Sequence, residues 1–147
     1  MSPLLVILHW VLPFLAAAGT VLIHHAGIGL VYSKVLRTRG LETAAPNMVQ
    51  ALLVLLAAHL FEIALFAVGF VLLQAFATEP VLTGAIDYSF PDYIYYSATT
   101  YTSLGLGDVY PAKPARLLTG VEALTGLIMI AWTAAFLFAE TERSDGD

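Results

Sequence analysis

The chain contains no cysteine and few charged residues, and each of these shortages excludes some classes of protein. Without cysteine it can build neither a disulfide framework nor a thiolate metal site. Asp, Glu, Lys and Arg make up only 12% of the 147 residues, and no basic cluster suits nucleic acid or anionic lipid. No segment carries the repeated arginines of a voltage sensor. Because the chain has no basic cluster, we expect no nucleic-acid partner.

Hydrophobic residues dominate instead, at 59% of the chain. A soluble domain of this length could not bury so much apolar material. Three stretches, 4–32, 48–76 and 117–138, each reach the ~20 apolar residues that a helix needs to cross a bilayer. We predict an all-α membrane protein whose three transmembrane helices contact the lipid bilayer.

The positive charges predict the orientation of these helices. Lys34, Arg37 and Arg39 follow the first span in a short link, which is expected to lie in the cytoplasm. The N-terminus is then outside, residues 78–116 lie on the outer side, and the C-terminus is cytoplasmic.

The segment between the second and third spans is polar and interrupted by prolines. Pro91 suits the first turn of a helix, and the residues after it predict a short helix at 91–102 that ends in Thr102. An extended loop, 103–108, follows, and Pro111 and Pro114 are expected to prevent helix until the third span begins. The pattern predicts a half-helix that enters the membrane and a strand that leaves it.

Irregular backbone is tolerated at membrane depth only where it is buried in protein or lines a watery cavity. Gly105 and Gly107 accept positive φ angles, so successive carbonyl oxygens of the loop can turn to one side. Leu104 and Leu106 would then point away into packing, and the Ser103 hydroxyl would add an oxygen at the inner end. Rings of such oxygens replace the hydration shell of a weakly hydrated monovalent cation.

One strand cannot surround an ion, and the chain has one such loop. Four copies are therefore expected to assemble into a closed homotetramer. The C-terminal end of each pore helix would point its partial negative charge at the ion path, which favours cations.

Residues 97–111 resemble the pore loop of potassium channels, whose filter commonly reads TVGYGD, and the resemblance spans roughly 93–138. It places Ser103 at the filter threonine, Leu104 at the valine and Leu106 at the tyrosine, with Gly105 and Gly107 unchanged. By this resemblance K⁺ ions bind at Ser103, Leu104, Gly105 and Leu106.

Other implications of the resemblance concern the rest of the chain. Asp108 matches the filter aspartate, and Gly126 falls where the inner helix often has its gating glycine. The three-span layout resembles small bacterial channels, which implies the bacterial inner membrane. The implied function is passive K⁺ transport, with no enzymatic step and no cofactor besides the K⁺ ions bound in the filter.

The resemblance divides the chain in two. Residues 1–45 form an N-terminal transmembrane helix with its cytoplasmic link, and residues 46–147 form the pore domain. The expected parts of the pore domain are an outer helix (47–77), a pore helix (91–102), a filter (103–108) and an inner helix (116–139).

Two departures from the family pattern leave the ion specificity open. Leu106 removes a tyrosine hydroxyl that normally anchors the filter, so a non-selective cation channel is the alternative to a potassium-selective one. Thr99 stands where some bacterial channels carry a glutamate paired with the filter aspartate. We expect Tyr95 to serve Asp108 as a partner in its place.

Ionisable residues inside the predicted spans are functional candidates. His59 and Glu62 lie three residues apart on one helix face, and His24 sits at a similar depth in the first span. The three form a structural hydrogen-bond cluster, a pH sensor, or the ligand set of a haem- or metal-binding membrane protein.

A second carboxylate, Glu122, opens the third span at the expected depth of the pore helix. It either supports the filter from behind or reaches the interface to pair with Arg116 or Lys113.

Overall fold

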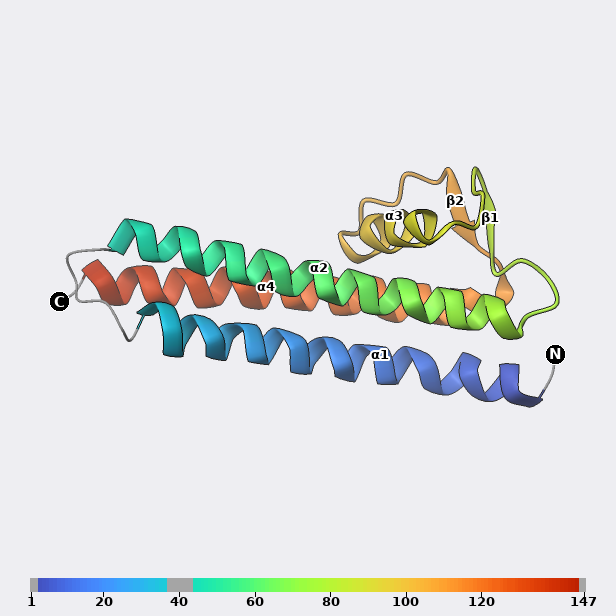
Figure 1. Ribbon diagram of the computed structural model, residues 1–147, viewed down its shortest axis with the longest axis horizontal. Helices are drawn as coiled ribbons and strands as arrows, with labels where there is room; N and C mark the ends of the chain where they lie inside the picture. Colours follow the sequence, from blue (N-terminus) through green and yellow to red (C-terminus); the bar gives the residue numbers. More distant parts are fainter. Residues whose placement is uncertain (1–2, 37–43, 146–147) are drawn as a thin grey trace.

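The computed structural model describes residues 3–36 and 44–145, and three long helices dominate it. They are α1 (Pro3–Leu30), α2 (Ala44–Phe76) and α4 (Arg116–Asp145), and a π-helical turn, Val31–Leu36, continues α1. The three helices contact one another and run lengthwise side by side (Figure 1). The predicted spans therefore exist as one bundle.

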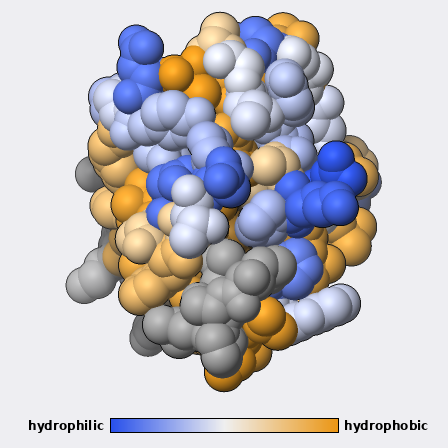
Figure 2. All heavy atoms as spheres, turned by 90° about the vertical axis from the view of Figure 1, so that its right-hand side faces the viewer, coloured by the Kyte–Doolittle hydropathy of each residue, from blue (hydrophilic) through white to orange (hydrophobic). Residues whose placement is uncertain are grey.

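The outside of this bundle is apolar. All three helices are long and hydrophobic enough to cross a membrane, over Val6–Ser33, Met48–Phe76 and Lys113–Glu142. Large side chains such as Trp10, Phe14, Phe61 and Leu127 are exposed along them. Seen from one end, hydrophilic residues gather on the end face while the flanks remain hydrophobic (Figure 2). The chain is an integral membrane protein of the all-α class, as predicted.

The interrupted segment folds against one side of the bundle near the C-terminal end of α2 (Figure 1). Its helix α3 (Phe90–Tyr101) agrees with the prediction of 91–102 to within one residue. Pro91 lies in the first turn, where its missing N–H is not needed. The Asp92 carboxylate accepts hydrogen bonds from the N–H groups of Asp87 and Ser89, and these bonds lower the pKa of Asp92. The turn that starts α3 is thus fixed by its own residues.

Two short strands flank α3, and the sequence did not predict them. β1 (Leu82–Gly84) pairs antiparallel with β2 (Val109–Pro111). A 3-10 turn, Lys113–Ala115, leads into α4, whose α-helix begins at Arg116, where the third helix was expected to start. Pro114 lies in the first turn of this short 3-10 segment, where its missing N–H is not needed.

A buried aromatic cluster holds α3 between α2 and α4. Phe70 of α2 and Tyr96 of α3 meet edge to face, with ring centroids 5.0 Å apart. Phe66 and Leu118 are fully buried beside them. In a bilayer, where lipid tails are as apolar as these side chains, the cluster is held by close van der Waals packing. This packing fixes the position of α3 and therefore of the loop that follows it.

Part of the orientation prediction lies outside the described residues. Arg37 and Arg39 belong to the segment 37–43, and the side chain of Lys34 is not described either. The orientation and the division at residue 45 stay predictions.

Candidate functional site

The loop after α3 alternates in backbone handedness. Ser103, Gly105 and Gly107 have φ angles of 57°, 50° and 81°. Two of these follow from glycine, which adopts positive φ freely. Ser103 was not expected to share this conformation, and its only signal in the sequence is its place two residues before Gly105. Every second residue of the loop is therefore left-handed.

The N–H groups at the start of the loop turn back to α3. Leu104 and Gly105 both donate to the carbonyl oxygen of Thr99, at 2.8 and 3.1 Å. No cis peptide bond occurs in the described residues, and a trans peptide points its C=O opposite to its N–H. The carbonyl oxygens of Ser103 and Leu104, which share those peptide units, therefore point away from α3.

The far side of the loop is open in the single chain. The side chains of Leu104 and Leu106 are each 61% exposed. No heavy atom lies within 4 Å of the position that a Cβ would take at Gly105 or Gly107. The loop is thus attached to α3 on one side and uncovered on the other.

The C-terminal end of the loop is fastened through Asp108. The Tyr95 hydroxyl donates to Asp108 Oδ2 at 2.7 Å, which is the contact expected from the sequence. This bond lowers the pKa of Asp108 and raises the pKa of Tyr95. The Asp108 carbonyl also accepts from the Ala85 N–H at 2.9 Å, and only a glycine at position 84 leaves room for that carbonyl. Gly84 was not singled out in the sequence, where nothing marks it apart from other glycines.

Behind α3 lies a fully buried carboxylate, Glu122 of α4. Its Oε1 contacts the Ser97 hydroxyl of α3, and that hydroxyl also lies 2.7 Å from the Ile63 carbonyl oxygen of α2. Its Oε2 has no protein partner among the described residues. Glu122 therefore faces α3 and not Arg116 or Lys113.

Gly126, one turn further along α4, lies against the end of α3. A Cβ at Gly126 would collide with the carbonyl group of Tyr101. This close approach is a packing reason for a glycine here, and the predicted role as a gating hinge stays a prediction.

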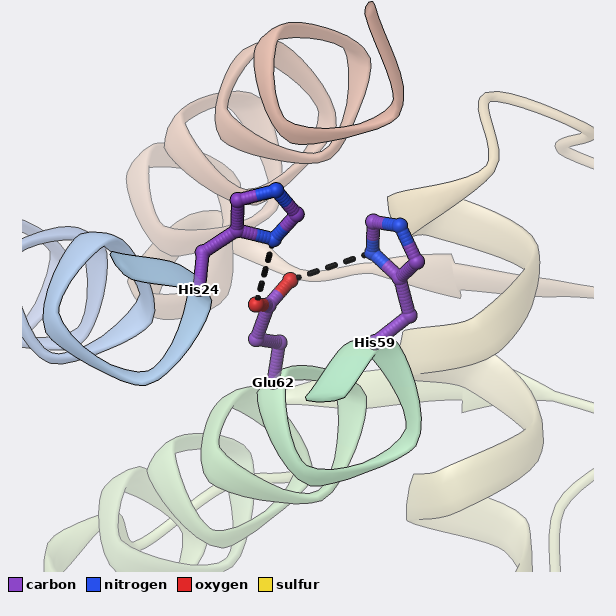
Figure 3. Close-up of side chains that lie close together, drawn as sticks. All are labelled: His24, His59 and Glu62. Atoms are coloured by element: carbon purple, nitrogen blue, oxygen red, sulfur yellow. Dashed lines mark hydrogen bonds and ion pairs between the residues drawn. The ribbon is translucent and has the colours of Figure 1, made fainter. Parts of the chain in front are cut away.

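A second polar cluster lies deeper in the bundle, and it brings together the three residues expected from the sequence (Figure 3). His24 Nδ1 lies 3.0 Å from Glu62 Oε1, and His59 Nδ1 lies 3.2 Å from Glu62 Oε2. His24 and Glu62 are fully buried. Both imidazoles point at one carboxylate, an arrangement that can hold either a proton or a metal ion.

The cluster contains two residues that sequence reasoning missed. The Tyr101 hydroxyl donates to Glu62 Oε2 and lies 2.9 Å from His59 Nδ1. Thr133 Oγ1 lies 3.0 Å from His59 Nε2 and 3.3 Å from His24 Nε2. Neither has a spacing relative to Glu62 that would reveal the contact, because they come from α3 and α4. The cluster thus joins all four helices.

A family model described as "Ion channel" matches residues 53–143, which is more than half of the chain. The match covers most of α2, the whole of α3 with its loop, and nearly all of α4. The searches of curated proteins and of solved structures gave no significant match.

Proposed function

Since the chain belongs to the ion channel family, we propose that it is a subunit of a homotetrameric potassium-conducting pore. The filter in this proposal is Ser103, Leu104, Gly105, Leu106 and Gly107 of each subunit. K⁺ binds to oxygens at Ser103, Leu104, Gly105 and Leu106. Thr102, Asp108, Tyr95 and Glu122 support the filter. The protein carries K⁺ passively and performs no chemical reaction.

The observation that carries this proposal is the backbone of the loop. Left-handed residues at 103, 105 and 107 alternate with the two leucines, and the first N–H groups are bound by Thr99. With the N–H groups occupied at α3, the carbonyl oxygens of Ser103 and Leu104 are free to coordinate a cation on the other side. Backbone carbonyl rings of this kind are the selectivity element of potassium channels.

Four copies are needed because one loop offers oxygens from one side only. Leu104 and Leu106 are exposed in the single chain, where no other described residue covers them. In a tetramer the neighbouring subunits would cover these two apolar side chains. A cyclic tetramer closes the ring of oxygens and buries these leucines together.

The remaining assignments rest on the sequence. The N-terminal helix and link (1–45) precede a pore domain (46–147). The protein lies in a bacterial inner membrane with its N-terminus outside. Gly126 serves as the gating hinge. Leu106 in place of tyrosine makes selectivity for K⁺ over Na⁺ the part of the proposal that most needs a direct measurement.

The first test is uptake of radioactive rubidium into liposomes that contain the purified protein. We expect uptake well above that of protein-free liposomes, because Rb⁺ fits sites built for a weakly hydrated cation. Excess external Na⁺ should leave it unchanged if the filter selects K⁺ and should suppress it if the pore is non-selective. Native mass spectrometry of the same preparation should show four chains. Uptake at the protein-free level from an assembled tetramer would contradict the proposal.

A second prediction concerns Tyr95→Phe, which removes the hydrogen bond to Asp108. That bond holds the pKa of Asp108 below its ordinary value of 3.8, so its stabilisation is present at neutral pH and is lost as pH falls through the lowered pKa. Without the bond the pKa of Asp108 moves back up. Rubidium flux should therefore be lost at a higher external pH in the variant.

The measurement is the external pH at which flux falls to half, in wild type and variant. Tyr88→Phe is the matched control, because its hydroxyl donates to the Leu82 carbonyl and not to Asp108. Equal midpoints in wild type and Tyr95→Phe would show that the contact does not support the filter.

A further inference from the structure

The hydrogen atoms of the deep cluster can be counted from its contacts. Six contacts join five side chains, which come from α1 (His24), α2 (His59, Glu62), α3 (Tyr101) and α4 (Thr133). Each hydroxyl carries one hydrogen, a neutral imidazole carries one, and a carboxylate carries none. An arrangement of these hydrogens must leave no two lone pairs facing each other.

The count begins at Tyr101, whose hydroxyl hydrogen goes to Glu62 Oε2. His59 Nδ1 faces the same two oxygens, so it must carry the hydrogen of its ring. His59 Nε2 is then an acceptor, and it takes the one hydrogen of the Thr133 hydroxyl. Three of the four donors are now fixed.

His24 closes the network. Because Thr133 has given its hydrogen to His59, His24 Nε2 must donate to Thr133 Oγ1, and this uses the one hydrogen of a neutral His24 ring. The contact between His24 Nδ1 and Glu62 Oε1 is then left without a hydrogen, although its atoms lie 3.0 Å apart. No arrangement with two neutral histidines and an ionised Glu62 satisfies every contact.

We propose that His24, His59 and Glu62 form a buried proton-binding site, which holds one extra proton between His24 Nδ1 and Glu62 Oε1. The proton belongs to the pair. Whether it is drawn on the imidazole or on the carboxyl, the cluster has the same composition and no net charge. An ionised Glu62 without it would leave an uncompensated charge inside a transmembrane bundle, which is costly.

The contacts of the Thr133 hydroxyl support the proposed proton site. Three other threonines of α4 donate to the carbonyl four residues earlier in the chain: Thr119, Thr125 and Thr141. The Thr133 hydroxyl instead lies between the two Nε2 atoms. A hydroxyl that donates once and accepts once suits one imidazole with a free lone pair and one that carries a hydrogen there.

A metal ion fits these atoms less well. One ligand atom from each of His24, His59 and Glu62 lies within 4.8 Å of the others, so three donors are at hand, but they are already engaged. Both carboxylate oxygens and both Nδ1 atoms already have hydrogen-bond partners, and the Tyr101 hydroxyl lies among them.

The proton site connects to the loop through Tyr101, the last residue of α3 and two residues before Ser103. Besides the cluster, two neighbours act on this region. The ring centroids of Trp132 and His24 lie 5.2 Å apart, and Glu122 acts on Tyr101 electrostatically. When the proton leaves, Glu62 and His24 lose their hydrogen bond, and the carboxylate that accepts from the Tyr101 hydroxyl is left with an uncompensated charge. On the proposed function, this alters conduction.

The experiment counts the proton directly, by ¹⁵N NMR of histidine-labelled protein and infrared spectroscopy of its carboxyl groups. The measurement is made near pH 8, above about 6.5, where a free imidazole titrates. We expect one proton per chain, as an imidazolium at His24 or as a protonated Glu62. Glu62→Gln should lose this signal, and His25→Ala, which removes a neighbouring imidazole outside the cluster, should keep it.

Two neutral imidazoles beside an ionised Glu62 in the wild-type protein would overturn the proposal, and this result needs no variant to fold. An imidazolium that persists in Glu62→Gln, or one equivalent of transition metal in the purified chain, would also overturn it. Neither measurement depends on conduction, so a failure of the channel function is seen separately.

The link to the loop has its own test in rubidium flux measured across the pH range in which the proton leaves. We expect a step in wild type that is absent in Tyr101→Phe, which keeps the ring and removes the hydroxyl. Flux that is flat in wild type while the proton leaves would overturn the coupling.

Discussion

Gly105→Ala should abolish rubidium flux while the protein still inserts and assembles as a tetramer. Gly105 has a φ of 50°, and an L-residue with a Cβ pays about 1–2 kcal/mol to adopt that conformation. The loss repeats in four subunits of one filter, about 4–8 kcal/mol in total. Since about 1.4 kcal/mol is a factor of ten, the conducting conformation would fall roughly 10³-fold or more in population.

Within one chain the cost is one of backbone conformation, because apart from its chain neighbours no heavy atom of the described residues lies within 4 Å of the added Cβ. Gly29→Ala is the matched control. It also has open space around its Cβ, but it sits in α1 without a positive φ, where alanine favours the helix. Native mass spectrometry and flux are measured on both variants. Wild-type flux in Gly105→Ala would show that this loop is not the filter.

The parts of the fold that the sequence predicted are those with a strong local signal. Apolar length predicted the three spans, and Pro91 marked the start of α3 to within one residue. β1 and β2 were missed because three residues are too few to show alternation, and their pairing joins segments 27 residues apart, as in Thr83 with Tyr110. The register depends on the position of α3 between them.

In the candidate site, too, the residues with a local signal in the sequence could be predicted and the others could not. Gly105 and Gly107 were predictable because a positive φ favours one residue type, whereas Ser103 adopts the same conformation without any such mark. His59 and Glu62 share a helix face, so their contact could be expected from their spacing. Thr133 and Ser97 could not be found, since a hydroxyl on one helix becomes a partner only when a second helix packs against it.

The last prediction concerns Glu122, whose burial behind α3 gives it a direct route to the filter. Its Oε1 contacts the Ser97 hydroxyl, which also faces the Ile63 carbonyl, so this one group links α2, α3 and α4. Glu122→Ala removes the partner and leaves a void behind the pore helix. Removing one member of a buried hydrogen bond costs about 1–3 kcal/mol, and four copies act on one narrow structure.

We therefore expect Glu122→Ala to destabilise the tetramer or to let the filter collapse at low potassium, with lower melting temperature and lower rubidium flux. Glu122→Gln should preserve both in part, because its amide keeps the shape and can donate to Ser97 Oγ while the hydroxyl donates to Ile63. Thr141→Ala, on an exposed part of the same helix, is the control. If Glu122→Ala matches wild type in potassium-dependent thermal stability and in flux, the carboxylate is buried behind α3 without supporting the filter, and the loop is held by other contacts, among them those of Asp108 and of the Thr99 carbonyl.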